Sequence, residues 1–248
     1  MLKLYNELAD WWSLLSPVED YEEEATFFGE TLAKAGLPPS PSLLELGCGG
    51  GSNAYHLKKM FARVTLTDIS PAMLRISQAL NPECEHIEAN MRTVRLGREF
   101  DAVFVHDAID YMITPQELKQ AMETVFVHCK PGGVALFVPD DVTESFEPST
   151  ESDGSDGVDR AARYIEWSYD PDETDYNYTV EYAYLLRERD GSVHVEHERH
   201  LIGLFPHDEW LRMLREVGFE AESVRDPYER DIFVAHKPVK INSIARKM

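Results

Sequence analysis

The stretch Leu43-Leu-Glu-Leu-Gly-Cys-Gly-Gly-Gly-Ser-Asn53 decides the fold. In it a short apolar run leads into glycines at positions 47, 49 and 51, and a segment with helical patterning follows. Glycines permit a tight turn and let the backbone approach a ligand closely. The backbone N–H groups of such a turn, with the N-terminus of the next helix, favour an anionic group such as a carboxylate or phosphate. The stretch therefore predicts a strand, a ligand-binding turn and a helix.

Apolar runs alternate with helical patterns through the first 140 residues. Pro71 and Pro115 each follow a Ser or Thr, as expected for an N-cap with proline at the first helical position. Alternation of this kind implies parallel strands joined by right-handed crossovers, and hence a doubly wound sheet. Short strands are expected at 42–46, 63–67, 84–89, 100–105 and 133–138, and helices at 52–60, 71–80 and 115–129.

The pattern changes after residue 140. Residues 140–159 are acidic and rich in Ser and Gly, so we expect a surface loop there. Strand-like alternation follows, and Asp190-Gly191 is a type I′ hairpin signal. A two-residue turn would place Tyr182 opposite Arg199, and Glu181 opposite His200. One strand face is predicted to carry Tyr178, Val180, Tyr182, Tyr184 and Leu186.

The α/β pattern returns at the end of the chain. An amphipathic helix is expected at 207–217, ended by Gly218, with closing strands at 220–224 and 231–236. We therefore expect an N-terminal helical cap (1–39), a core (40–140 and 205–238), an acidic loop with an antiparallel β lid (141–204) and a tail (239–248) that carries Lys240, Arg246 and Lys247.

Composition limits the partners. The chain has 45 acidic and 24 basic residues among 248, a formal charge of −21, which disfavours nucleic acid and anionic lipid. There is no apolar run of membrane-spanning length and no signal-peptide pattern at the N-terminus. Cys48, Cys84 and Cys129 show no metal-ligand spacing, and His194 and His197 share no metal geometry with a third ligand. We expect a cytoplasmic protein with a small-molecule substrate and no metal.

Two features distinguish a dinucleotide from other cofactors: the spacing of the glycines and the presence of two acidic residues. A dinucleotide turn needs a glycine at position 52, where this chain has Ser52. Glu45 fits a site that holds the amino group of a bound amino acid. Asp68 ends the second strand, about twenty residues after the glycines, where a carboxylate accepts hydrogen bonds from both hydroxyls of a ribose.

Further candidates for nucleoside contacts follow the second and third strands. Ile69 and Met73 would flank an adenine ring, although Met73 also reads as an ordinary core residue. The Asn90 side-chain oxygen can accept from an adenine amine, and the Met91 backbone N–H can meet a ring nitrogen.

These motifs together resemble the class I S-adenosylmethionine-dependent methyltransferases. Over residues 40–140 the matching segments occur in the family's order, with Asn90 where an aspartate is commoner: Glu45-Leu-Gly-Cys-Gly-Gly-Gly51, Asp68-Ile-Ser-Pro-Ala-Met73, Asn90-Met-Arg92, Phe100-Asp-Ala-Val103 and Lys130-Pro-Gly-Gly133. The resemblance implies a Rossmann-like, mostly parallel seven-stranded sheet with an antiparallel β insertion after strand five. It also implies that the glycine loop (Gly47, Cys48, Gly49, Gly51) and Glu45 hold the methionine moiety.

A looser resemblance links the chain to small-molecule N-methyltransferases of the amino-sugar type. It rests on residues 90–100 and on His200-Leu-Ile-Gly-Leu-Phe205. In those enzymes an antiparallel insertion lies over the active site and a Tyr-rich N-terminal segment covers the cofactor. Here that segment is Tyr5-Asn-Glu-Leu-Ala-Asp-Trp-Trp12, followed by Asp20-Tyr21, so Tyr5 is expected at the cofactor and Tyr21 near the substrate.

Methyl transfer needs an in-line approach and the removal of one proton, so a strong base is optional. His106 and Asp107 follow the fourth strand and are candidates for cofactor contact and catalysis, with His200 as a further candidate base. Substrate contacts are predicted at Tyr21, Asp110, Tyr111, Asp141 and Tyr178. We interpret Tyr182 and Arg199 as members of cross-strand pairs that stabilise the sheet rather than as substrate contacts. This interpretation also allows a homodimer through the β insertion.

Four interpretations stay open at this point. The leading one is methyl transfer to a small amine, and transfer to the oxygen of a small carboxylate or hydroxyl is the second. A nicotinamide-dependent oxidoreductase is disfavoured by Ser52 and Glu45. The last is a non-catalytic nucleoside-binding module that uses its acidic lid as a partner surface.

Overall fold

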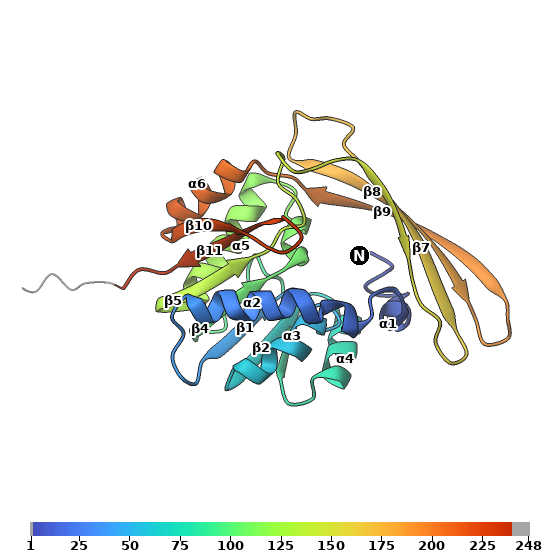
Figure 1. Cartoon of the computed structure of the whole chain (residues 1–248), viewed down its shortest axis with the longest axis horizontal. Helices are drawn as coiled ribbons and strands as arrows, with labels where there is room; N and C mark the ends of the chain where they lie inside the picture. Colours follow the sequence, from blue (N-terminus) through green and yellow to red (C-terminus); the bar gives the residue numbers. More distant parts are fainter. Residues whose placement is uncertain (1, 240–248) are drawn as a thin grey trace, which may run out of the picture.

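A computed structural model describes residues 2–239 of the chain. Two sheets divide the molecule: a seven-stranded sheet in the core and a four-stranded sheet that projects from one end of it (Figure 1). Met1 and the predicted tail from Lys240 onwards lie outside the described residues.

The seven-stranded sheet is the predicted α/β core. Its spatial order is β10-β11-β5-β4-β1-β2-β3, and β11 alone runs antiparallel to its neighbours. The strands are β1 (Ser42–Leu46), β2 (Arg63–Asp68), β3 (Glu85–Glu88), β4 (Phe100–Val105), β5 (Cys129–Phe137), β10 (Glu220–Arg225) and β11 (Asp231–His236). The order steps outward from β1 in both directions, so the carboxyl ends of β1, β2 and β4 meet at one edge, where ligands bind in such sheets. The predicted fold class is confirmed.

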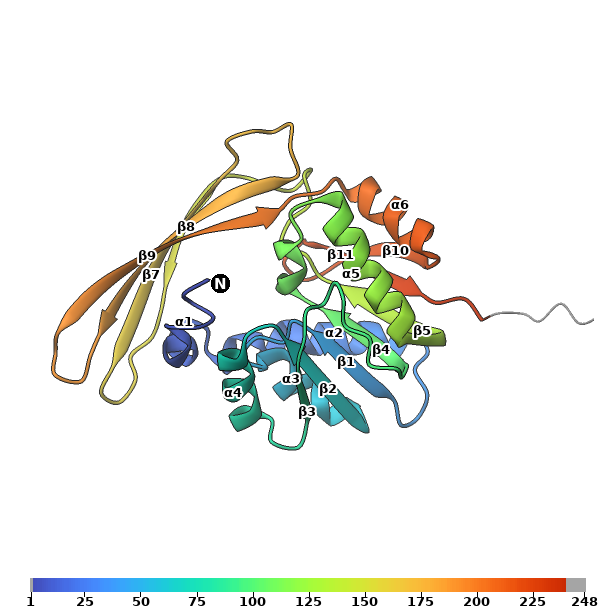
Figure 2. The ribbon, with the colours of Figure 1, turned by 180° about the vertical axis from the view of Figure 1, so that it is seen from behind.

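Helices cover both faces of this sheet (Figure 2). α2 (Glu22–Lys34), α3 (Ser52–Leu57) and α4 (Pro71–Leu80) pack on one face through Phe28, Leu57 and Leu74. α5 (Pro115–His128) and α6 (His207–Val217) pack on the other through Leu118 and Trp210. The predicted helix at 52–60 is α only to Leu57 and continues as the short 3₁₀ helix η3 (Lys58–Met60).

The predicted caps form. The hydroxyl of Ser70 accepts from the N–H of Met73 at 3.2 Å, and that of Thr114 accepts from the N–H of Glu117 at 3.2 Å. In each helix proline occupies the first turn, where a missing N–H costs nothing. Gly218 ends α6 with φ of +119°, a conformation that L side chains rarely adopt.

The second sheet has the order β6-β7-β8-β9 and is antiparallel throughout. Its strands are β6 (Ser149–Asp153), β7 (Ala161–Tyr169), β8 (Asn177–Arg187) and β9 (Val193–Gly203). The prediction that 140–159 is all loop was wrong, because β6 lies inside it. Acidic composition hid this strand, whose backbone pairs with the edge of β7.

The hairpin register was also wrong by one residue. Glu181 pairs with Arg199, and Val180 with His200. The loop has three residues rather than two: the Gly191 N–H donates to the carbonyl of Glu188, and Gly191 has φ of +85°. A turn closed by a left-handed glycine is the usual three-residue hairpin, which shifts every cross-strand pair by one position.

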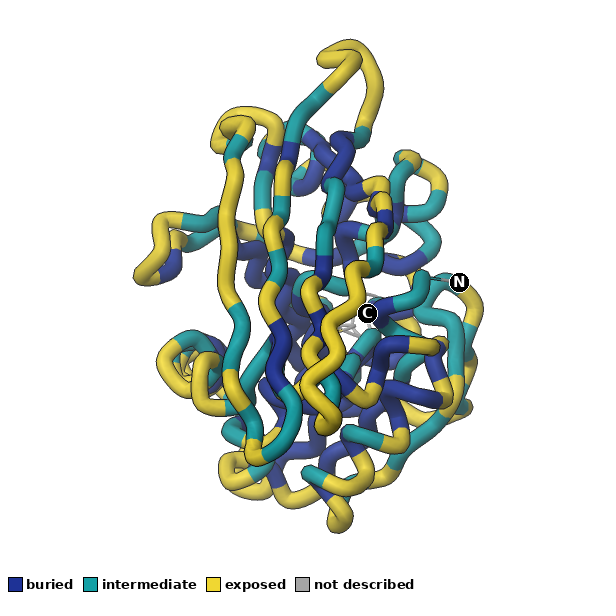
Figure 3. Tube along the Cα trace, turned by 90° about the vertical axis from the view of Figure 1, so that its right-hand side faces the viewer, coloured by how far each residue is buried: buried dark blue, intermediate teal, exposed yellow. Residues whose placement is uncertain are grey.

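Exposed and more buried residues alternate along β7 and in the second half of β9. Figure 3 shows exposed and buried stretches side by side in this sheet. On the inner face, Tyr184 and Leu186 pack with Leu4, Leu8 and Trp11 of the N-terminal segment. That segment contains η1 (Ala9–Trp11), α1 (Trp12–Leu15) and η2 (Val18–Tyr21). The N-terminal segment therefore fills the space between the core and the four-stranded sheet. We call the four-stranded sheet the lid.

Within residues 2–239, no helix has the length and apolar character needed to cross a membrane. The same residues hold no group of three His, Cys, Asp or Glu side chains placed to bind a metal ion.

Candidate active site

A cavity of about 400 Å³ lies at the edge where β1, β2 and β4 end. Its walls come from the residues that follow these strands and β3, and from the N-terminal segment, which contributes Tyr5, Trp12 and Tyr21. The motifs that the sequence analysis placed at separate strand ends therefore meet around one space.

The glycine turn forms the floor of this cavity. Gly47 has φ of +74°, and a Cβ there would lie 2.3 Å from the Cβ of Ala108 and 2.8 Å from the Cε of Met91. Gly49 and Gly51 have φ of +50° and +80°. At Gly47 and Gly51 both space and conformation exclude a side chain, whereas at Gly49 the space is open and the conformation alone favours glycine.

The turn's amides are largely used within the protein. The N–H groups of Gly47 and Cys48 donate to the carbonyl of Thr67, that of Gly51 to the carbonyl of Cys48, and that of Gly49 to the Asp68 carboxylate. These four amides are therefore not free to hold an anion in this structure, and the prediction of an anion at the turn rests on the remaining N–H groups of the turn and of the N-terminus of α3. The four amides fix the turn to β2 instead.

Glu45 is the unusual group of the cavity floor. Its side chain is 3% exposed, and its Oε2 has no hydrogen-bond partner among residues 2–239. Burial raises the pKa of Glu45 to about 8, although the nearby positive charge of His106 opposes the shift. A buried carboxylate without a partner fits a ligand that brings a positive charge, such as the amino group of an amino acid.

Asp68 also lines the cavity, at the end of β2. One carboxylate oxygen accepts from the N–H of Ser70 at 2.7 Å and the other from the N–H of Gly49 at 2.9 Å. Burial nevertheless raises the pKa of Asp68, because it outweighs these bonds. Each oxygen keeps a free lone pair, so the carboxylate can still accept from a ribose while holding the turn.

Of the remaining residues predicted to contact the nucleoside, some line the cavity and one does not. Ile69, Asn90 and Met91 line the cavity. The Asn90 side-chain oxygen accepts from the N–H of Arg92 at 2.9 Å, so it shapes the turn after β3. Met73 is fully buried with Ala9 and Ala72 and does not line the cavity. The N-terminal segment packs over Met73, so this structure shows the core position that the sequence also allowed, and contact with adenine stays a prediction.

His106 and Asp107 lie at the end of β4, where the short 3₁₀ helix η4 (Asp107–Tyr111) begins. The His106 ring lies 3.4 Å from a carboxylate oxygen of Glu24 and 3.0 Å from one of Asp107. Burial alone would lower the pKa of His106, but the two carboxylates outweigh it and raise that pKa well above its usual value. A protonated imidazole gives no free lone pair, which argues against His106 as a base.

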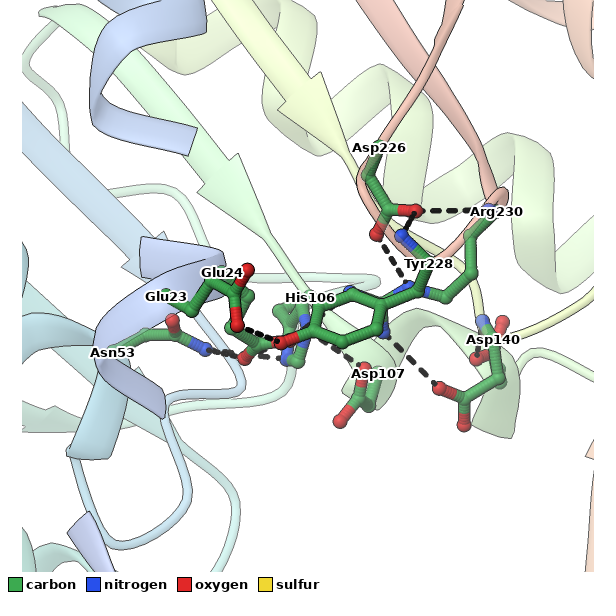
Figure 4. Close-up of polar contacts among 10 residues, drawn as sticks. Glu23, Glu24, Asn53, His106, Asp107, Asp140, Asp226, Tyr228 and Arg230 are labelled. Carbon is green, nitrogen blue, oxygen red and sulfur yellow. Dashed lines mark hydrogen bonds and ion pairs between the residues drawn. The ribbon is translucent and has the colours of Figure 1, made fainter. Parts of the chain in front are cut away.

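A polar cluster that the sequence analysis missed surrounds His106 (Figure 4). Arg230, from the β10–β11 loop, contacts Glu24 at 3.0 Å, Asp226 at 2.7 Å and Asp140 at 3.9 Å. The amide of Asn53 lies 3.3 Å from the His106 ring. No local motif marks these residues, because segments far apart in the chain bring them together.

A second network joins the cavity wall to the lid. The hydroxyls of Tyr5 and Tyr111 lie 2.6 Å apart, and the Tyr111 hydroxyl lies 2.8 Å from Nδ1 of His200. Nε2 of His200 lies 3.1 Å from the carboxylate of Glu198. Tyr5 and Tyr111 line the cavity, whereas His200 is 1% exposed and lies behind Tyr111.

The two ring nitrogens of His200 have different roles. A proton on Nε2 donates to Glu198 and leaves Nδ1 to accept from Tyr111. Burial lowers the pKa of His200, although Glu198 opposes the shift. Burial raises the pKa of Tyr111 well above its usual value, so the phenol stays protonated. The network is therefore a neutral phenol hydrogen-bonded to a neutral imidazole.

The other residues predicted to contact the substrate differ in whether they line the cavity. Tyr21 lines the cavity and shares a 2.6 Å hydrogen bond with Ser16. Three predicted residues do not line it. Asp110 is buried and accepts from the N–H of Asp140 at 2.8 Å, Asp141 accepts from the hydroxyl of Ser145, and Tyr178 packs on Phe146. These contacts lie within the protein, and substrate contact by Asp110, Asp141 and Tyr178 stays a prediction.

Comparison with known proteins gives consistent results. Residues 43–133 match the family described as methyltransferase domain. The chain is 29% identical over 207 residues to dTDP-3-amino-3,6-dideoxy-alpha-D-glucopyranose N,N-dimethyltransferase of Streptomyces fradiae, which covers 82% of this chain and 79% of that protein. It is 28% identical to dTDP-3-amino-3,4,6-trideoxy-alpha-D-glucopyranose N,N-dimethyltransferase of Streptomyces venezuelae, over 87% of this chain and 91% of that protein.

A solved structure is similar over nearly the whole chain. The crystal structure of DesVI from Streptomyces venezuelae superposes with a TM-score of 0.82 at 26% identity, covering 94% of this chain and 98% of the other. The likeness extends beyond the core to the lid and the N-terminal segment. Together with the cavity and its unpartnered Glu45 carboxylate, these findings identify the chain as a class I S-adenosylmethionine-dependent methyltransferase.

Proposed function

We propose that the protein transfers a methyl group from S-adenosylmethionine to an amine nitrogen of a small molecule. The observation that carries this proposal is the pairing of two groups around one cavity. An unpartnered buried carboxylate, Glu45, lies on the floor, and the Tyr111–His200 network lies in the wall. The relatives named above are N,N-dimethyltransferases, which supports nitrogen over oxygen as the acceptor.

The cofactor would be held by the floor and the two adjoining walls. Glu45 would pair with its amino group, Asp68 would accept from its ribose hydroxyls, and Ile69 and Met91 would border its base. Tyr5 would close the cavity from the N-terminal segment, since its carbonyl accepts from the hydroxyl of Ser70. When bound, S-adenosylmethionine supplies a methyl group on a positively charged sulfur.

The protein's part in the reaction is orientation and removal of one proton. The amine reacts through its lone pair, so a protonated amine must first lose a proton. Tyr111 can accept that proton on its oxygen while passing its own proton to Nδ1 of His200. The Glu198 carboxylate then stabilises the imidazolium, as the acid does in a Ser-His-Asp triad. We assign His200 the role of proton acceptor. We assign His106 a structural role, as a positive charge beside Glu45.

The test is methyl transfer from S-adenosylmethionine carrying a deuterated methyl group to a panel of small amines, carboxylic acids and alcohols, followed by mass spectrometry. We expect the label on nitrogen, with His200→Ala lowering turnover much more than cofactor affinity. Label on oxygen alone would refute the proposal. Binding of the cofactor without transfer to any acceptor would favour a non-catalytic module.

We also propose a homodimer through the outer face of the lid and a cytoplasmic location. Large apolar side chains exposed on that face support the dimer, among them Ile165, Trp167, Leu185 and Val195. Three free cysteines support a reducing compartment. Light scattering tests the dimer: Trp167→Glu should give a monomer, and a monomeric wild type would refute it. The charge of −21 argues against nucleic acid as a partner.

A further inference from the structure

The two faces of the lid differ in charge. Pairing and alternation place its three strand arginines, Arg163, Arg187 and Arg199, on the outer face. The opposite, inner face carries Tyr164, Glu166, Tyr182, Tyr184 and Glu198. In the strands of the described lid, every arginine therefore points away from the core, and tyrosines and carboxylates face it.

This inner face lies close to the cavity through a chain of contacts, although none of its residues lines the cavity in this structure. The Tyr182 ring lies 4.8 Å from the His200 ring between centroids, and His200 is hydrogen-bonded to the cavity residue Tyr111. Glu166 lies beside Tyr182 and is partly buried. Tyrosine faces and carboxylates both attract ammonium groups, and the attraction grows where water is excluded. The acceptor side of the cavity is therefore suited to a cation.

Basic groups near the cavity already have carboxylate partners. Among residues 2–239 the basic side chains in its lining are Arg92 and His106. Arg92 is paired with Glu117, and His106 lies between Glu24 and Asp107. Arg230, in the polar cluster around His106, contacts three carboxylates, those of Glu24, Asp140 and Asp226.

We infer that the methyl acceptor is a cationic amine that carries no phosphate group. This rests on the proposed function and narrows it, because the relatives' names give dTDP-linked amino sugars as substrates. A nucleoside diphosphate needs arginine or lysine donors that are free to pair with it. In the part of the chain that the structure describes, the cavity offers none, and its acidic lining would repel the two negative charges of a diphosphate.

Methyl transfer to an amine is compatible with carboxylates near the acceptor side of the cavity. The nitrogen lone pair forms the new N–C bond, the C–S bond breaks with its electrons on sulfur, and one proton leaves the nitrogen. That proton goes to His200 through Tyr111, both of which are neutral. Two carboxylates could hold a positive charge elsewhere on the acceptor: Asp107 lines the cavity, and Glu166 pairs with Tyr182 on the inner face of the lid.

The first test compares one sugar with and without its nucleotide. Free 3-amino-3,6-dideoxyglucose, its dTDP-linked form and spermidine are offered to the full-length protein with S-adenosylmethionine, and product is measured by mass spectrometry. We expect at least tenfold higher kcat/KM for a free amine than for the dTDP-linked sugar. Preference for the dTDP-linked sugar would overturn the inference and leave the proposed function standing. Transfer to none of the three amines would overturn both.

The second test uses a matched pair of variants on opposite faces of the lid. Glu166→Gln removes an inner carboxylate, and Glu181→Gln removes an outer one that pairs with Arg199. With the preferred free amine, calorimetry in the presence of S-adenosylhomocysteine should show at least fivefold weaker amine binding for Glu166→Gln and an unchanged Kd for Glu181→Gln. Equal effects of the two changes, or no effect of the inner one, would contradict the inference. Circular dichroism checks that both variants fold.

Discussion

Glu45→Gln tests how the cavity recognises a positively charged ligand. The side chain is 3% exposed, and one of its oxygens has no hydrogen-bond partner in the described part of the chain. Truncating one partner of a buried charge pair costs about 2–5 kcal/mol, which corresponds to a Kd about 30-fold or more weaker. We expect this loss for S-adenosylhomocysteine, which carries the same amino group as the cofactor and is chemically stable. Glutamine keeps the shape of the side chain, so the fold should persist.

The same group makes binding depend on pH. Because burial raises the pKa of Glu45 to about 8, the carboxyl of the free protein is mostly protonated at pH 7 and must lose its proton to pair with an amino group. At pH 7 this ionisation costs about 1.4 kcal/mol, one pKa unit. Affinity should therefore rise about ninefold from pH 6 to 7 and about fivefold from pH 7 to 8, as long as the ligand's amino group stays protonated.

Isothermal calorimetry in buffers with different ionisation enthalpies measures both effects. The wild type should release close to one proton on binding at pH 7, and Glu45→Gln should release almost none from this site. If the variant binds as tightly as the wild type, or if affinity is flat between pH 6 and 8, the assignment of Glu45 to the amino group is refuted.

Three further predictions concern the turn, the ribose wall and the proton network. Gly47→Ala should destabilise the fold by about 2–5 kcal/mol in urea titrations, since it adds a left-handed side chain that overlaps Ala108; a loss under 1 kcal/mol would contradict the packing. Asp68→Asn should weaken S-adenosylhomocysteine binding at least tenfold by calorimetry with a native circular dichroism spectrum, and unchanged affinity would remove Asp68 from the ribose site. Glu198→Gln should lower kcat about tenfold with little change in cofactor Kd. Because Glu198 raises the pKa of His200, the acidic limb of the kcat–pH profile should also move to lower pH. An acidic limb that does not move would mean that Glu198 has only a packing role.

Much of the core could be predicted because its signals are local. The glycines from Gly47 to Gly51 mark the turn by themselves, and Ser70-Pro71 marks a helix start within two residues. The strand order and the place of Glu45 and Asp68 at one edge then follow from the topology of parallel sheets. The family resemblance rests on these same local motifs.

The lid and the acceptor side depended on information that the sequence does not carry locally. One extra loop residue before Gly191 shifted all pairs of the hairpin, and the strand β6 had no apolar pattern. Glu198 and Arg230 acquire their roles from partners more than a hundred residues away, such as Leu4 and Glu24. Met73 was assigned to the ligand because its covering segment could not be placed beforehand.

A crystal structure of the protein with S-adenosylhomocysteine would test the central claim most directly. We predict one nucleoside in the cavity, with its amino group in contact with the free oxygen of Glu45 and its ribose hydroxyls in contact with Asp68. A nucleoside bound elsewhere, or one whose amino group lies away from Glu45, would contradict it.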